Sequence, residues 1–220
     1  MYQPPRIQVI GEMLWSRLRA LTPPRVRPAR SVLLRQGDPA THVILLDSGS
    51  ALVTLTGASG GQTLLAVRGA GELLGELAVL DDRPRTATVI AAEACHVHIV
   101  PAPEFLKFVN THELLTPLLR HAISRVRESD AVRFELATAS VPVRLASALY
   151  RLVEASSTMS AQHSVPLTQA ELSQLIGASR NAVGSALRPW REEGWVRTAA
   201  GGGLLVCNIH AIQSHAQMQT

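Results

Sequence analysis

Residues 167–190 read LTQAELSQLIGASRNAVGSALRPW, and their local signals predict two short helices joined by a tight turn. Thr168 and Glu171 form the Thr-x-x-Glu pattern of a capping box, which starts the first helix. Gly177 can adopt the positive φ of a turn, and Ser179 is placed to cap the second helix. The stretch therefore predicts a helix-turn-helix.

The second of these helices has an apolar side and a polar side. At helical spacing, its apolar positions are Val183, Ala186, Leu187 and Trp190. The opposite, exposed side carries Arg180, Asn181, Gly184, Ser185 and Arg188. Pro189 lacks a backbone N–H, so we expect the last turn of the helix to be kinked.

The residues that follow predict a small β-hairpin. Residues 195–198 and 204–208 are strand-like, and the glycine-rich stretch 199–203 forms a turn between them. An ordinary antiparallel helix pair would explain the two helices but not the hairpin. Two helices followed by a hairpin make a winged helix-turn-helix, whose second helix enters the major groove of double-stranded DNA.

Position along the second helix then assigns DNA-contacting roles. Its first turn faces base edges, so Arg180 is placed to bind a guanine and Asn181 an adenine. Arg188, Arg197 and the Ser179 hydroxyl are placed for phosphates, which orient the protein without specifying sequence. The predicted DNA-binding residues are Thr168, Ser179, Arg180, Asn181, Gly184, Ser185, Arg188 and Arg197.

Residues 31–100 have a different texture. Short runs of Val, Leu and Ile alternate with turn signals roughly every 10 to 12 residues, the spacing of an antiparallel sandwich or barrel. No pattern for a parallel crossover helix interrupts them. Residues 7–21, which precede this region, show the apolar spacing of a short helix.

A long helix is predicted after the sheet region, starting at Thr116 as N-cap with Pro117 in the first turn and running to about Ala137. Its heptad positions are Leu115, Ala122, Ser129 and Leu136, with Leu118, Leu119, Val126 and Val132 between them. Such a helix either packs on its own sheet or pairs with a second copy through residues 115–136. About 20 helical residues extend about 30 Å, more than a small sheet covers, which favours a homodimer. Residues 137–142 are predicted to form a hinge, because Pro142 disfavours helical geometry at Val141.

Residues 75–89 read GELAVLDDRPRTATV and hold the groups of a compact anion site. Gly75 lets the backbone approach a ligand, and the Glu76 carboxylate can accept from sugar hydroxyls. The amides of a short helical turn starting near Leu77 and the Arg85 guanidinium suit a phosphate.

This stretch resembles the phosphate-binding cassette of cyclic-nucleotide-binding domains. With the winged helix behind it, the chain is similar to the catabolite-activator/FNR (CRP/FNR) family of bacterial transcription regulators. The resemblance covers about residues 32–208 and rests also on RQGDPA at 35–40 and GASRNAVGSAL at 177–187. It implies an α+β fold with three parts. These are an antiparallel β-roll of jelly-roll type with an N-terminal helix in 1–110, a dimerisation helix in 111–138, and a winged helix-turn-helix DNA-binding domain in 139–220.

The resemblance implies a homodimeric DNA-binding regulator gated by cyclic AMP, with cyclic GMP as a second candidate effector. The implied ligand-binding residues are Gly75, Glu76, Leu77, Arg85, Thr86, Ala87, Ser129 and Asp130. Ser129 and Asp130 match the positions that read the adenine, although the family's cyclic-AMP readers usually carry an uncharged hydroxyl where Asp130 stands. The alternative is the same DNA-binding regulator with a vestigial pocket, acting without ligand or with another effector.

The implied DNA partner is a pseudo-palindromic operator. Arg180 is retained from the family pattern, but Asn181 and Ser185 replace its usual Glu and second Arg, so we expect a different operator sequence. An activator of this kind also contacts RNA polymerase, and no pattern in the sequence locates that surface.

Several other classes are excluded. Cys95 and Cys207 are too few for a disulfide framework, a CxxC-type zinc site or an iron–sulfur cluster. No segment has the pattern of a membrane span or signal peptide, so we expect a soluble, cytoplasmic protein.

His96 and His98, with Glu104 downstream, suggest a jelly-roll oxygenase, but no third histidine is placed to complete its metal site. Strand alternation places Cys95 in the core and both histidines outside, so we expect no haem, metal, cofactor or catalytic residue.

The net charge of +4 does not point to the DNA-binding part. Residues 1–35 carry net +6, residues 36–143 net −4 and residues 144–220 only net +2. The basic side chains are 20 arginines and one lysine, a compositional bias rather than a signature of nucleic-acid binding. The case for DNA therefore rests on where particular arginines stand.

Overall fold

The structure is a computed structural model that describes residues 9–155, 163–199 and 202–217. It divides into two compact units, which we describe separately. The sheet unit comprises residues 1–62 and 66–129, and the C-terminal unit comprises residues 63–65 and 130–220. The predicted start of the first helix at Ile7 and the predicted wing turn at residues 200–201 lie outside the described residues.

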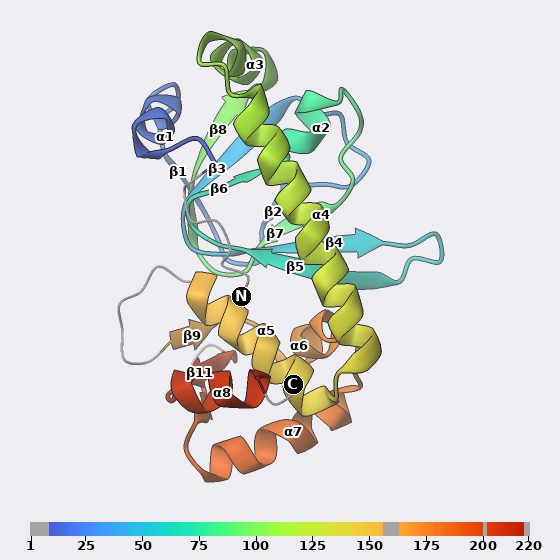
Figure 1. The fold of residues 1–220 in the computed structure, drawn as a ribbon. Helices are drawn as coiled ribbons and strands as arrows, with labels where there is room; N and C mark the ends of the chain where they lie inside the picture. Colours follow the sequence, from blue (N-terminus) through green and yellow to red (C-terminus); the bar gives the residue numbers. More distant parts are fainter. Residues whose placement is uncertain (1–8, 156–162, 200–201, 218–220) are drawn as a thin grey trace. The chain divides into compact units, whose positions relative to one another are not determined.

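The sheet unit is built from two four-stranded sheets (Figure 1). In spatial order, one contains β1 (Arg25–Arg27), β8 (Cys95–Pro101), β3 (His42–Ser48) and β6 (Glu72–Leu74). The other contains β2 (Val32–Leu34), β7 (Thr88–Ala91), β4 (Ala51–Thr56) and β5 (Gln62–Arg68). The pairs β1–β8, β8–β3, β3–β6, β2–β7 and β7–β4 are antiparallel. The predicted antiparallel β fold is confirmed.

Helices cover one end and one side of these sheets (Figure 1). They are α1 (Glu12–Arg19), α2 (Glu76–Leu80), α3 (Ala102–Thr111) and the long α4 (Leu115–Thr138). Trp15 of α1, Phe105 of α3 and Leu118 of α4 join one buried apolar cluster with strand residues such as Val43. Burial of this cluster fixes where α4 lies relative to α2, and so where a ligand pocket can form.

The start of α4 differs from the prediction. The helix begins at Leu115, and the Leu118 amide donates to the Leu114 carbonyl at 3.0 Å, so Thr116 lies inside the first turn instead of capping it. Pro117 remains in that turn, where its missing N–H costs little. The buried side chain of Leu114 anchors this end of the helix in the core.

Helix α4 presents two different faces, so both interpretations of its periodicity hold in part. Leu118 is 1% exposed in the core of its own unit, and its assignment to an intermolecular seam is wrong. A separate stripe of exposed apolar side chains runs along the helix: Leu115, Leu119, Ile123 and Val126. Ile123 belongs to this stripe although the heptad pattern did not include it. At 3.6 residues per turn, these four positions share one side of the helix.

The prediction for His98 is also wrong. Cys95 is buried and His96 is exposed as expected, but His98 is 6% exposed and its Nδ1 lies 2.8 Å from the Thr22 carbonyl oxygen. Alternation along β8 correctly separates the two sides of the strand. The segment after α1 covers the second side, so alternation does not predict exposure there.

After the end of α4, the described residues of the C-terminal unit form four helices and three strands. They are α5 (Val141–Ala155), β9 (His163–Val165), α6 (Gln169–Leu175), α7 (Arg180–Glu192), β10 (Val196–Thr198), β11 (Leu204–Val206) and α8 (Ile209–Ala216). The strands form an antiparallel sheet in the order β10-β11-β9. The winged helix-turn-helix fold is confirmed, but α5, β9 and α8 were not predicted. Helix α5 already includes Val141, with Pro142 in its first turn.

No helix in the described part of the chain is long and apolar enough to cross a membrane.

Candidate ligand pocket and candidate DNA-binding surface

A cavity of about 180 Å³ opens in the sheet unit beside α2. Six of the predicted ligand residues line it: Gly75, Glu76, Leu77, Arg85, Thr86 and Ala87. Apolar side chains from both sheets, such as Leu34 and Leu73, complete its wall together with Arg68 and Arg125. An apolar cavity with a few convergent charged groups is the usual form of a small-molecule site.

Arg85 is the buried cation of this cavity. The residue is 4% exposed. Its Nη1 donates to the Gly75 carbonyl at 2.7 Å, and its Nη2 donates to the His42 carbonyl. Burial lowers the pKa of Arg85, whereas the carboxylates of Glu76 and Asp38 act to raise it. A guanidinium held by two carbonyl oxygens is preorganised at the cavity wall and remains charged at neutral pH.

The conformation of Gly75 makes room for that guanidinium. Gly75 has φ of 81°, in the left-handed region, and directly precedes α2. A Cβ at this position would lie 2.5 Å from Arg85 Nη1 and 2.8 Å from Leu34 Cδ1. The position therefore requires glycine for two reasons, the backbone angle and the close approach of Arg85.

Glu76, the first residue of α2, is the buried anion of the cavity. It is 5% exposed, and burial raises the pKa of its carboxyl, while Arg125 and Arg68 act to lower it. A buried carboxylate is costly unless donors reach it. Glu76 lies in the cavity wall, where its carboxylate oxygens can accept hydrogen bonds.

A cluster of alternating charges lies next to Glu76, and sequence reasoning missed it. Arg125 Nη2 donates to Glu72 at 2.6 Å, and Arg68 Nη1 donates to both oxygens of Glu128 at 3.0 and 3.1 Å. Arg125 Nη1 lies 3.9 Å from Glu128, and Arg68 Nε lies 4.0 Å from Glu72. The four charges bind α4 to β5 and β6. The only advance signal was the spacing of Arg125 and Glu128 on one helix face.

Ser129 and Asp130 do not line the cavity of this chain. Both are exposed, and Asp130 makes an exposed ion pair with Arg133 at 3.7 Å. Ser129 lies about one turn after Arg125 on α4, at an angle between the side that carries Arg125 and the exposed apolar stripe. A role for these two residues in ligand binding stays a prediction.

The helix-turn-helix has the local geometry that its sequence predicts. Thr168 caps α6: its Oγ1 accepts from the Glu171 amide at 3.2 Å, and the Glu171 carboxylate accepts from the Thr168 amide at 2.8 Å. Gly177 has φ of 58° in the turn. Ser179 Oγ accepts from the Ala182 amide at 3.1 Å and so caps α7. These bonds fix the angle at which α7 leaves the turn.

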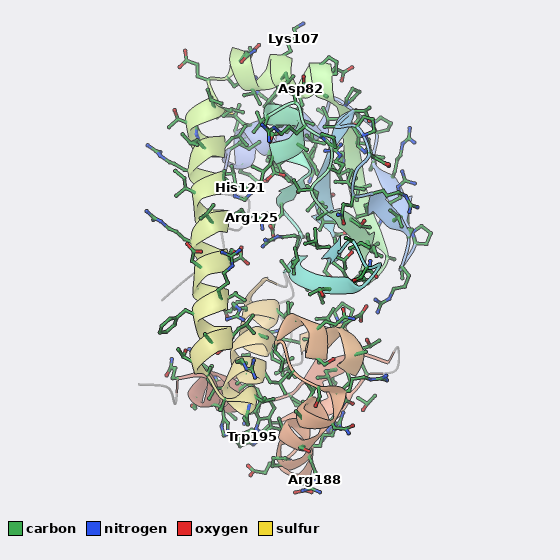
Figure 2. All side chains as sticks on the ribbon, turned by 90° about the vertical axis from the view of Figure 1, so that its right-hand side faces the viewer. Asp82, Lys107, His121, Arg125, Arg188 and Trp195 are labelled. Atoms are coloured by element: carbon green, nitrogen blue, oxygen red, sulfur yellow. The ribbon has the colours of Figure 1, made fainter. Side chains whose placement is uncertain are left out.

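Helix α7 buries one side and exposes the other. Its apolar stripe is buried as predicted: Val183, Ala186, Leu187 and Trp190. The exposed residues among the predicted DNA contacts are Thr168, Ser179, Arg180, Asn181, Ser185, Arg188 and Arg197. Figure 2 shows Arg188 extending outward from the protein. Helix α7 continues through Pro189 to Glu192, and Gly194 follows its end with φ of 72°.

Gly184 is placed differently from the other predicted DNA contacts. It is half-buried, and a Cβ at this position would lie 2.9 Å from Gln169 Nε2. The same Gln169 amide donates to the Arg180 carbonyl at 3.0 Å. Gly184 therefore lets α6 approach α7, and any contact with DNA would be made by its backbone.

Comparison with known proteins identifies both units. Residues 24–112 match the model of the cyclic nucleotide-binding domain, and residues 143–214 match the Crp-like helix-turn-helix domain. The chain is 30% identical to the cyclic AMP receptor protein of Thermus thermophilus over 185 residues, covering 80% of this chain and 81% of the relative. The chain belongs to the CRP/FNR family of DNA-binding transcription regulators.

A second relative and a solved structure are also similar to this chain. The chain is 26% identical to the CRP-like cAMP-activated global transcriptional regulator of Mycobacterium tuberculosis, over 86% of each chain. The solved structure of FixK2 from Bradyrhizobium japonicum is similar in fold, with a TM-score of 0.74 over 88% of this chain and 96% of FixK2, at 14% identity. The fold extends across both units of the chain.

The described residues of the sheet unit offer no support for the metal-dependent oxygenase or for a haem site at Cys95 and His98. No group of three or more His, Cys, Asp or Glu side chains among them could hold a metal ion. Cys95, whose pKa burial raises, donates to the Ser50 and Glu93 carbonyls at 3.3 Å each, and His98 is bonded to Thr22. Both side chains thus have structural partners.

Proposed function

We propose that this chain is a homodimeric transcription regulator whose DNA affinity is set by 3′,5′-cyclic AMP bound in the cavity of the sheet unit. The observation that carries the proposal is the pair of buried, oppositely charged groups, Arg85 and Glu76, on the wall of one cavity. A cyclic nucleotide offers what each needs: an anionic phosphate for Arg85 and a ribose 2′-hydroxyl for Glu76.

Neighbouring groups suit the same ligand. The exposed hydroxyl of Thr86 and the backbone around Gly75 lie on the cavity wall beside Arg85 and offer further bonds to a phosphate. Leu77 and Ala87 add apolar contact. The relatives from Thermus thermophilus and Mycobacterium tuberculosis are named for cyclic AMP, which favours it over cyclic GMP.

The exposed stripe on α4 supports the homodimer. Leu115, Leu119 and Val126 are 65%, 58% and 60% exposed, although large apolar side chains gain free energy when they leave water. Pairing with a second α4 would bury them as a heptad seam. Ser129 and Asp130 would then lie where the two helices meet, close enough to the ligand to contact its base.

Gating requires more than the phosphate contact. To move the active fraction from 1% to 99%, a ligand must favour the active state by about 5.5 kcal/mol. One charge-assisted bond to Arg85 contributes about 1.5–3 kcal/mol. The hydroxyl bond to Glu76 and base contacts across the dimer supply the remainder, and Ser129 is the residue we assign to the base contacts.

In the C-terminal unit, Arg180 and Asn181 would read base edges from the first turn of α7, and Ser179, Arg188 and Arg197 would bind phosphates. The partner is double-stranded DNA with two half-sites, one for each copy of the chain. A cytoplasmic location follows from this role. RNA polymerase is the further partner that an activator needs, and the proposal assigns no residue to it.

Thermal unfolding with and without cyclic AMP and cyclic GMP tests the gating. A ligand that binds only the folded protein raises the melting temperature. At a ligand concentration of a hundred times its Kd, the free energy of unfolding increases by about 2.7 kcal/mol. We expect a rise with cyclic AMP, a smaller rise in Ser129→Ala, and tighter DNA binding when cyclic AMP is present. If neither nucleotide shifts the melting temperature, the gating proposal is wrong.

One observation favours an alternative in which the pocket no longer binds a nucleotide. Both terminal nitrogens of Arg85 already donate to backbone carbonyl oxygens of the chain itself. The protein would then bind DNA without ligand or with another effector. Equal DNA affinity with and without either nucleotide would support this alternative.

A further inference from the structure

His121 lies on α4 between the cavity and the charge cluster, and none of the roles above uses it. The residue is 4% exposed. Its Nε2 lies 3.2 Å from Arg125 Nε and 3.6 Å from Glu76 Oε1. Figure 2 shows His121 and Arg125 pointing from α4 toward the strands of the sheet unit. The imidazole of His121 therefore contacts both the Glu76 carboxylate, which lines the cavity, and Arg125.

The contact with Arg125 fixes the tautomer of the ring. An arginine Nε always carries a proton, so it donates and His121 Nε2 accepts. A neutral imidazole has one proton, which must then be on Nδ1. Nδ1 is buried without a hydrogen-bond partner in the described structure. Burying this N–H without a partner lowers the stability of the folded state, and the hydrogen bond at Nε2 has to offset that loss.

Burial and the arginines around His121 keep the ring neutral. Burial together with Arg125 and Arg68 lowers the pKa of His121 to about 4, against the opposing effect of Glu128. From β6 and α2 the ring is also approached by Glu72, through Arg125, and by Glu76. At neutral pH His121 is consequently an acceptor at Nε2 and not a cation that could pair with Glu76.

This arrangement decides which carboxylate Arg125 binds. Its Nε is held by His121, and its Nη2 bonds Glu72 at 2.6 Å. Among the described residues, no arginine lies within ion-pair distance of Glu76, although Arg125 is near enough to lower the pKa of that carboxyl. Without an acceptor at His121 Nε2, Arg125 would be free to turn to Glu76.

We propose that His121 is a positioning residue of the ligand pocket: it holds Arg125 on Glu72 and so keeps the Glu76 carboxylate open for a ligand hydroxyl. The inference rests on the proposed binding of a cyclic nucleotide. It predicts that the effect of His121 on binding depends on the ribose 2′-hydroxyl, because that is the ligand group assigned to Glu76.

The experiment compares calorimetric affinities for cyclic AMP and its 2′-deoxy analogue in the full-length protein. We expect the wild type to prefer cyclic AMP by about tenfold or more, the value of a hydrogen bond to a charged group. In His121→Leu, Arg125 captures Glu76, so affinity for cyclic AMP falls to near that for the analogue. His121→Gln keeps an acceptor for Arg125 and is expected to restore most of the preference.

A merely structural role of His121 predicts a different result. Loosened packing would lower the affinity for both ligands equally and leave the ratio of the two affinities unchanged. An unchanged ratio in His121→Leu, or equal loss of preference in the Leu and Gln variants, overturns the inference. If the wild type binds neither nucleotide, the proposed function fails, and the assignment to Glu76 fails with it.

A second measurement needs no ligand and no variant. Nitrogen-15 NMR of the ligand-free protein reports which ring nitrogen of His121 carries the proton. We expect the Nδ1–H tautomer between pH 5.5 and 8. An Nε2–H tautomer or an imidazolium in that range would show that His121 does not hold Arg125, whether or not nucleotides bind.

Discussion

The cavity of the sheet unit and the exposed face of α7 use charge in opposite ways. In the cavity, Arg85 and Glu76 are almost fully buried, and Arg85 bonds backbone carbonyls of its own unit. On α7, Arg180 and Arg188 are exposed. Buried charges must be compensated by the fold, whereas exposed charges are compensated by water.

This difference separates stability from binding. A change in the cavity is expected to alter both the stability of the fold and the ligand affinity, because the same side chains contribute to both. A change on the exposed face of α7 is expected to alter DNA binding alone. The four predictions below test that separation, in order of decreasing effect.

The largest effect is expected for Arg85→Leu. The variant loses the phosphate-binding cation and also leaves the carbonyls of Gly75 and His42 without their donor. We expect no calorimetric binding of cyclic AMP, and a ligand-free protein destabilised by about 1–3 kcal/mol. Arg83→Leu, two residues earlier and exposed, is the matched control and should change neither quantity. Unchanged affinity in Arg85→Leu would refute the phosphate site.

Protonation of His121 is expected to lower the free energy of unfolding by about 3 kcal/mol as the pH falls from 6.5 to 4. Its pKa of about 4 in the folded protein lies below the ordinary value of 6.5, so the unfolded chain takes up a proton first as the pH falls. The wild type should lose stability through this window, and His121→Gln should lose less. The contribution of Glu76, whose raised pKa acts with the opposite sign, is present in both proteins and cancels.

Urea denaturation across this pH range measures the difference. His210→Gln, an exposed change on α8, serves as the control and should follow the wild type. Parallel curves for wild type and His121→Gln would mean that the imidazole is not buried as a neutral group.

A smaller and purely functional effect is expected for the arginines of α7. Arg180→Ala should cost about 1–3 kcal/mol of DNA affinity at one base pair of each half-site. Arg188→Ala should weaken binding to all sequences alike and reduce the salt slope by about one. Neither change should move the melting temperature by more than the surface norm of about 0.5 kcal/mol. Competition binding with base-substituted operators checks both, and identical sequence preferences in the two variants would contradict the assignment.

The smallest effect is expected for Thr168→Ala, which removes the capping box of α6. Loss of an N-cap costs about 1 kcal/mol of stability. Chemical denaturation monitors this loss, with Gln174→Ala on the same helix as an exposed control. Affinity for cyclic AMP should be unchanged, since Thr168 is not among the residues that line the cavity.

Local signals explain what the sequence predicted well. The capping box at Thr168, the positive φ of Gly177 and the cap at Ser179 depend on residues within one or two turns of each other. The same holds for the pocket segment, where Gly75 to Ala87 are close along the chain. The regular spacing of turns also predicted an antiparallel sandwich or barrel of short strands, and the structure has two such sheets.

Contacts between distant segments explain what was missed. Arg68 and Glu72 meet Arg125 and Glu128 across more than fifty residues, and nothing near any of them signals the partner. Burial of His98 depends on Thr22, 76 residues away. Leu118 was placed on the wrong face of α4 because a heptad cannot show which of two apolar stripes meets the chain's own sheet. Strand β9 carries too few residues for a periodicity.

The two-faced α4 has a consequence for how this protein tolerates insertions. One added residue between Leu119 and Arg125 would rotate everything after it by about 100°. Arg125 and Glu128 would leave the charge cluster and Val126 would leave the apolar stripe in a single step. We therefore expect homologues that keep the cavity to conserve the length of this helix strictly, while the hairpin tip at residues 57–61 is free to vary. In this protein the number of residues in α4 is therefore constrained separately from the identity of each residue, because it sets which side of the helix each side chain occupies.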